Sequence, residues 1–159
     1  MATLPQLIEE DTQALDKILR EFLKRSDATA ALILDKGGFL IAHHGDTSQF
    51  DVTTISALAS GAYLANQTIA NLVQETNFDS VYQQGENSSM FVTNVDENCL
   101  LLVIFPAQIG VGIVKFCAGV ARERIAGQML TAEARDPDGG FDLSELNIAD
   151  TSSLFKRKE

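Results

Sequence analysis

The feature that most limits how this chain can fold is a run of 23 residues without a charge, from Val52 to Gln74. Asp51 precedes the run, and because Asp is a favourable N-cap we predict a helix from Val52 to about Glu75. Its many Ser, Thr, Asn and Gln residues make it too polar for a membrane span, which needs about 20 predominantly apolar residues. The solvated face of a helix is normally charged, so we expect protein to cover this helix on both flanks.

Plotted at about 100° per residue, this helix shows one apolar stripe, which we predict to face a sheet. The stripe consists of Ile55, Leu58, Ala62, Ala65, Ile69, Leu72 and Val73. The rest of the circumference carries small or uncharged side chains, namely Ala57, Ser60, Gly61, Tyr63, Leu64, Gln67, Thr68 and Asn71.

Small residues let another backbone approach closely, and an exposed tyrosine offers a large contact area. We therefore interpret the side of the helix away from the sheet as a protein interface. The alternative is a helix that other parts of the same chain bury.

The remaining segments predict one α+β domain over residues 1–130. We expect a first helix that begins at a capping box of Thr3 and Gln6, and a last helix over roughly 109–130. Short apolar runs separated by turns predict strands at 30–34, 39–42, 80–83, 89–93 and 100–105. Hairpin connections predict a five-stranded antiparallel sheet with helices on both faces. Residues 131–159 are interpreted as a linker and a C-terminal tail with a short interaction segment.

Groups that could carry chemistry are few. His43 and His44 are adjacent, and neighbours in a strand point to opposite faces, so they do not form a shared metal site. Cys99 and Cys117 lie in apolar stretches and are expected to be buried thiols. The sequence contains no phosphate-binding loop of the G-x-x-x-x-G-K-[ST] type. We expect close helix–strand contact to explain Gly110 and Gly112. We therefore predict no catalytic residue, no metal site and no cofactor.

The net charge and the N-terminal segment limit which partners and which cellular location we expect. The formal net charge is −10 and the pI about 4.5, which disfavours a nucleic-acid partner because phosphates attract clusters of Lys and Arg. The first residues show neither the basic nor the apolar region of a secretion signal. We expect a cytoplasmic protein without membrane insertion.

The order helix, two strands, helix, three strands, helix resembles the roadblock (dynein light chain) family, which has the roadblock/longin type of fold. Within that family the chain is most similar to the MglB type, whose members are partners of a Ras-like GTPase. The similar segments are Leu34–Ile41, Leu58–Gly61 with Ala65, Ile69–Leu72, Leu102–Phe105, Gly112–Lys115 and the pair Leu154-Phe155.

The resemblance implies a homodimer in which two sheets join edge to edge through the weak strand at 81–83. It also implies that the second helices bind a Ras-like small GTPase and accelerate its GTP hydrolysis without supplying an arginine. The residues implied for partner binding are Ala57, Ser60, Gly61, Leu64, Ala65, Thr68, Leu154 and Phe155. Those expected at the dimer interface are Tyr63, Gln67, Val81, Tyr82 and Gln83.

Two alternatives remain open from the sequence. The same dimer could act as a scaffold that tethers a GTPase or motor complex without changing its turnover. A small-molecule sensor, which related sheet–helix folds can form, would need a polar-lined pocket that the sequence does not indicate.

Overall fold

A computed structural model of the chain describes residues 4–135, arranged as three helices and five strands. The elements follow the predicted order: α1 (Glu9–Ser26), β1 (Ala30–Asp35), β2 (Leu40–Gly45), α2 (Val52–Leu72), β3 (Ser80–Gln84), β4 (Ser88–Asn94), β5 (Cys99–Pro106) and α3 (Val111–Arg135).

The five strands form one antiparallel sheet in the order β2-β1-β5-β4-β3. β5 lies at its centre, as the run of residues that are apolar on both faces predicted. The two outer positions belong to β2 and β3, and β3 is the more exposed of these strands. The α+β class and the antiparallel sheet are confirmed.

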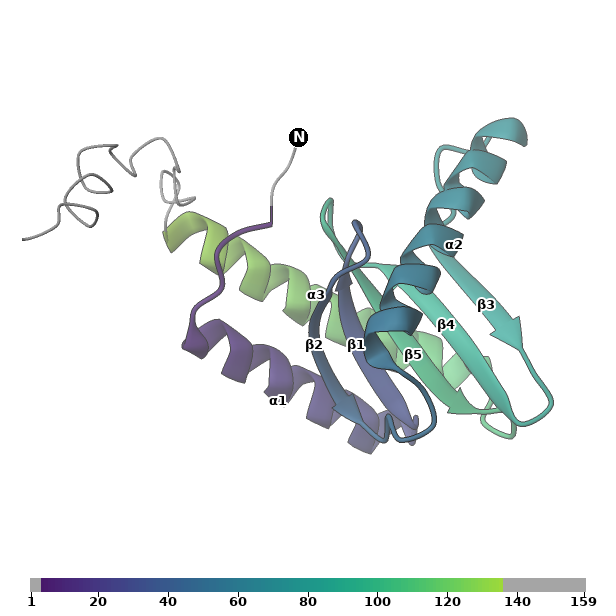
Figure 1. Cartoon of the computed structure of the whole chain (residues 1–159), viewed down its shortest axis with the longest axis horizontal. Coiled ribbons are helices and arrows are strands. Elements are labelled where there is room, and N and C mark those ends of the chain that lie inside the picture. Colours follow the sequence, from purple (N-terminus) through teal and green to yellow (C-terminus); the bar gives the residue numbers. More distant parts are fainter. Residues whose placement is uncertain (1–3, 136–159) are drawn as a thin grey trace, which may run out of the picture.

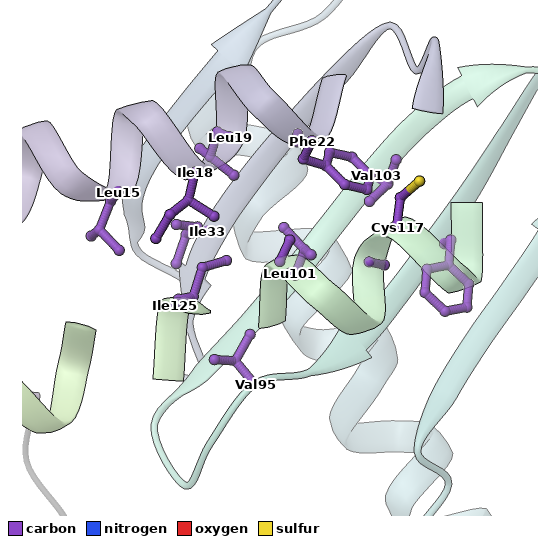
Figure 2. Packing of buried hydrophobic residues seen from close by; sticks show 14 of the residues in the cluster. Leu15, Ile18, Leu19, Phe22, Ile33, Val95, Leu101, Val103, Cys117 and Ile125 are labelled. Atoms are coloured by element: carbon purple, nitrogen blue, oxygen red, sulfur yellow. The ribbon is translucent and has the colours of Figure 1, made fainter. Parts of the chain in front are cut away.

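Helices cover both faces of the sheet, with α1 and α3 on one side and α2 on the other (Figure 1). Side chains alternate along each strand, so that Ile33, Leu101 and Val103 point to the α1–α3 side. Figure 2 shows Ile33 beside Ile18 and Val103 beside Phe22, with Leu101 between them. The core on the α2 side is smaller. Its buried members are Ala30, Leu32, Leu34, Ala59, Tyr63, Val92, Leu100 and Leu102.

The first helix starts later than the sequence predicted. Residues 4–8 are not helical, Thr3 lies outside the described range, and α1 begins at Glu9. The helix begins here because the carboxylate of Asp11, in its first turn, accepts a hydrogen bond from the backbone N–H of the preceding Ile8 at 2.9 Å. The predicted capping box of Thr3 and Gln6 is therefore wrong.

The last helix ends later than predicted, at Arg135 instead of about position 130. Arg135 donates two hydrogen bonds to the fully buried Asp11, at 2.8 and 3.0 Å, and Gln128 donates a third at 2.7 Å. These bonds hold the final turn of α3 against the start of α1. The division of the chain near residue 130 stays a prediction, although α3 continues across that position.

Two smaller expectations differ in outcome. Cys99 and Cys117 are buried free thiols, as predicted. Close packing does not explain Gly110 and Gly112, because a Cβ at either position would meet nothing within 4 Å, so that prediction is wrong.

Between residues 4 and 135, no helix combines the length and the apolar character that crossing a bilayer requires.

Candidate partner-binding surface

The orientation of α2 on the sheet differs from the one predicted by its apolar stripe. Its buried residues are Ser56, Ala59, Ser60, Tyr63 and Ala70. The predicted sheet-facing residues Leu58, Ile69 and Leu72 instead have exposed fractions of 67%, 48% and 78%. Ile55 does pack against the core on the sheet side, but most of the predicted stripe is exposed, so the predicted orientation was wrong and the more apolar side of α2 faces outward.

Close contact with the β1–β2 turn explains why small residues face inward. The hydroxyl of Ser60 donates to the backbone oxygen of Lys36 at 2.6 Å. Gly38 has a φ of 99°, and a Cβ there would lie 3.3 Å from the Cα of Ala57. A left-handed conformation and a near backbone both favour glycine at this turn. Small side chains on α2 therefore serve packing within the chain as well as any external contact.

Tyr63 and Gln67, predicted at a dimer interface, turn toward their own sheet. Tyr63 is buried, and burial, aided by the negative charge of Asp79, raises the pKa of its hydroxyl. Gln67 is half-buried and donates to the backbone oxygen of Phe78 at 3.0 Å, while its Oε1 lies buried with no hydrogen-bond partner. Ser60, predicted to contact a partner, is likewise buried. These three residues therefore act within the monomer.

The outward side of α2, here called the α2 outer face, is exposed and free of charge. Figure 1 shows its C-terminal turns extending past the ends of the strands. An apolar surface of this kind on an otherwise acidic protein marks a binding site. Its members are Ala57, Leu58, Gly61, Ala62, Leu64, Ala65, Thr68, Ile69, Leu72 and Val73.

Most of the residues predicted for partner binding lie together on this face. Ala57, Gly61, Leu64, Ala65 and Thr68 are all exposed, and space is open around Gly61. Leu154 and Phe155 lie outside the described residues.

The α2 outer face consists of two rows of residues. One row follows the β1–β2 turn, because Ala57 contacts Gly38, and we call it the turn-side row: Ala57, Gly61, Leu64 and Thr68. The other row lies on the flank of the helix away from that turn, and we call it the edge-side row: Leu58, Ala62, Ala65, Ile69 and Leu72.

Phe39 is a surface residue that sequence reasoning missed. It follows Gly38 in the β1–β2 turn, and 75% of it is exposed. The turn that carries Phe39 lies against the start of α2, so Phe39 is exposed apolar area close to that helix in the chain's fold. The glycine pair at 37–38 was a signal for it, because it places the next residue at the tip of a hairpin.

β3 presents a free edge beside α2. Its outer backbone groups have no strand partner within the described chain, and an unpaired edge is a template for another strand. Val81 is half-buried and Gln83 exposed. Tyr82 lies on the opposite side of the sheet from α2, where its ring stacks on Phe105 with centroids 6.0 Å apart. The predicted joining strand is thus placed where a second copy could reach it.

The two histidines lie apart from any group of metal-ligating side chains in the described chain. His43 is exposed on β2, and His44 Nδ1 lies 3.2 Å from Asp16 Oδ1. No three His, Cys, Asp or Glu side chains from residues 4–135 are grouped to hold a metal ion. What the geometry offers is a surface for binding macromolecules.

The profile of the Roadblock/LC7 domain matches residues 14–105, which is 92 of the 159 residues. This chain belongs to the Roadblock/LC7 family. The match spans α2, the β1–β2 turn and the β3 edge, so it includes both rows of the candidate surface. No curated protein matches the sequence.

Solved structures place this Roadblock/LC7 protein beside MglB proteins. An MglB with a tetrameric arrangement is 26% identical with a TM-score of 0.75, over 83% of this chain and 99% of that one. MglB from Thermus thermophilus, described as a gliding protein, is 26% identical with a TM-score of 0.74, over 82% and 99%. MglB from Myxococcus xanthus is 24% identical with a TM-score of 0.74, over 80% and 96%. The predicted MglB-type resemblance is confirmed.

Proposed function

We propose that this Roadblock/LC7 protein forms a homodimer that binds a Ras-like small GTPase through α2 and raises its rate of GTP hydrolysis. The observation that carries the proposal is the α2 outer face, which exposes several large apolar side chains without one charge. Water solvates such a face poorly, and burial against protein is favourable at about 25 cal/mol per Å². The likeness to MglB structures suggests which partner covers it.

In this proposal the two rows of the α2 outer face contact different molecules. The edge-side row meets the α2 helix of the second copy, while the free edges of the two β3 strands pair. Such an interface is isologous, since the same strand and helix come from each copy. It replaces the predicted dimer contacts of Tyr63, which is buried in the monomer, and of Gln67, which is half-buried there.

The turn-side row and Phe39 bind the GTPase. Gly61 allows the partner's backbone to approach, and Leu64 provides apolar area. The α2 outer face carries no arginine, so the gain in rate comes from repositioning the GTPase's own groups around the γ-phosphate.

A direct test mixes the purified protein with a purified Ras-like small GTPase and measures binding and phosphate release. We expect faster phosphate release with the natural protein. Gly61→Arg should abolish both binding and stimulation, because a charged side chain then lies in the contact.

Gly127→Arg is the matched control, since Gly127 is another exposed helical glycine with open space around it, on α3. It should behave as the natural protein does. Binding without any change in phosphate release would replace the activator with the scaffold. Loss of binding in both variants, or in neither, would contradict the α2 outer face as the binding site.

A further inference from the structure

The side of the molecule opposite α2 carries a second apolar surface. A shallow groove runs between α1 and α3, with Ile18 and Phe22 on one wall and Phe116 and Val120 on the other. Phe116 is 72% exposed and Val120 40%. Exposure of this size on a helix that otherwise covers the core indicates that something binds there.

The rim of this groove is basic, in contrast to the acidic protein as a whole. From Asp16 to Arg25, α1 has four cations against two carboxylates, a net charge of +2. Arg25 and Arg124 line the groove itself, where Arg124 pairs with Glu21. An occupant that combines apolar side chains with carboxylates would fit both properties of this surface.

The sequence directly after α3 has that chemistry. Residues 136–150 contain five carboxylates and no cation, and the apolar residues Phe141, Leu143, Leu146 and Ile148 alternate with them. The basic residues of the tail, Lys156, Arg157 and Lys158, come later. The stretch is thus complementary to the groove in charge as well as in apolar character.

The end of α3 gives this stretch a fixed starting point. Arg135 is held to the buried Asp11, so the described part of the chain ends beside the first turn of α1. Val120 lies 15 residues earlier on α3, or about 22 Å along the helix. Six to eleven residues of extended chain, from Arg135 to Phe141 or Leu146, span up to about 20–40 Å. Leu143 and Leu146 are therefore within reach of Val120, whereas Phe141 reaches only the end of the groove near Arg124.

We propose that residues 141–150 bind in the α1–α3 groove of their own chain, with Leu143 and Leu146 against Phe116 and Val120. The carboxylates of Asp142 and Glu145 then lie near Arg25 and Arg124. Bound in this way, the stretch covers an apolar patch that water solvates poorly. It also leaves Leu154 and Phe155 beyond the groove, free to meet another molecule.

The absence of tryptophan from the chain makes a clean test possible. Leu146→Trp places a single fluorescent indole in the stretch of an otherwise natural, full-length protein without a GTPase. We expect a blue-shifted emission maximum and protection from a soluble quencher such as acrylamide. Adding Phe116→Asp should return both readings to those of an exposed indole, since it removes the apolar contact and adds repulsion.

Leu130→Asp is the matched control, because Leu130 is also an exposed apolar residue of α3, at 65%, and does not line the groove. It should leave the emission unchanged. A second test uses the Leu146→Trp protein alone. Adding 1 M NaCl should weaken the protection of the indole from the quencher, because it reduces the Debye length to about 3 Å and screens the ion pairs.

An indole that is exposed in the natural background would overturn the proposal. So would equal effects of Phe116→Asp and Leu130→Asp, or protection that disappears on dilution, which would mean binding to another copy. These results do not bear on the GTPase proposal, because no GTPase is present and the α2 outer face is unaltered.

Discussion

The two faces of the sheet are covered in different ways. On one side, α1 and α3 pack over a large core, and the pairs Asp11–Arg135 and Glu21–Arg124 join the two helices. On the other side, α2 lies alone over a smaller core, makes no ion pair within the described chain, and leaves its more apolar flank outside. The α1–α3 layer is held by contacts within its own chain, whereas α2 exposes apolar surface that we propose other molecules cover.

The largest loss of unfolding free energy is expected in the core under α1. Leu15 is fully buried there. Leu15→Ala should lower the free energy of unfolding by about 2–5 kcal/mol, because it removes apolar contact and leaves a cavity. Urea unfolding followed by circular dichroism measures it. A loss below about 1 kcal/mol would mean that this layer is no better packed than α2, contrary to the comparison.

A smaller loss is expected from the buried carboxylate of Asp11. The guanidinium of Arg135, with the Ile8 N–H and Gln128, holds the pKa of Asp11 well below its usual value. Asp11→Asn should cost about 1–3 kcal/mol at pH 7, the usual range for a hydrogen bond to a charged group.

The sign of the pH dependence follows from that lowered pKa. The contribution of Asp11 is fully present above the unfolded-state pKa of about 4 and is lost as the pH falls through the folded-state pKa. The difference between the two proteins in urea unfolding should therefore shrink below about pH 4. A difference that stays constant down to about pH 2 would show that charge on Asp11 is not the cause.

The smallest effect on the monomer is expected on the α2 outer face. Leu58→Ser should change the unfolding free energy of the monomer by less than about 0.5 kcal/mol, since Leu58 is 67% exposed. It should nevertheless weaken the proposed dimer, because Leu58 lies in the edge-side row. Sedimentation across a range of concentrations measures dissociation, and Leu130→Ser on α3, with a similar exposure of 65%, is the control. Equal dissociation in both variants would remove the edge-side row from the dimer interface.

Sequence patterns predicted this fold well because its local signals agree. The apolar runs predicted all five strands to within a few residues, and Asp51 does cap α2, accepting from the Thr54 N–H at 2.7 Å. Where a helix starts was harder to predict, since the cap of α1 comes from Asp11, inside the helix, and depends on a contact with distant Arg135.

The orientation of α2 was predicted wrongly for a physical reason. Assigning the most apolar stripe of a helix to its own core assumes that the chain buries its best apolar surface itself. Here the turn at Gly38 comes so near the start of α2 that the small residues Ala57 and Ser60 lie against it, while Leu58, Ile69 and Leu72 are left outside. That choice depends on the packing of a distant turn, which periodicity within α2 does not contain.

The missing charge on α2 also determines how its complexes should respond to ionic strength. Binding through uncharged side chains gains no electrostatic steering, and screening ions have little to weaken there. Association at α2 should therefore continue in concentrated salt, while contacts at the basic rim between α1 and α3 should come apart. Changing the salt concentration alone would then separate the two surfaces of this molecule, before any residue is substituted.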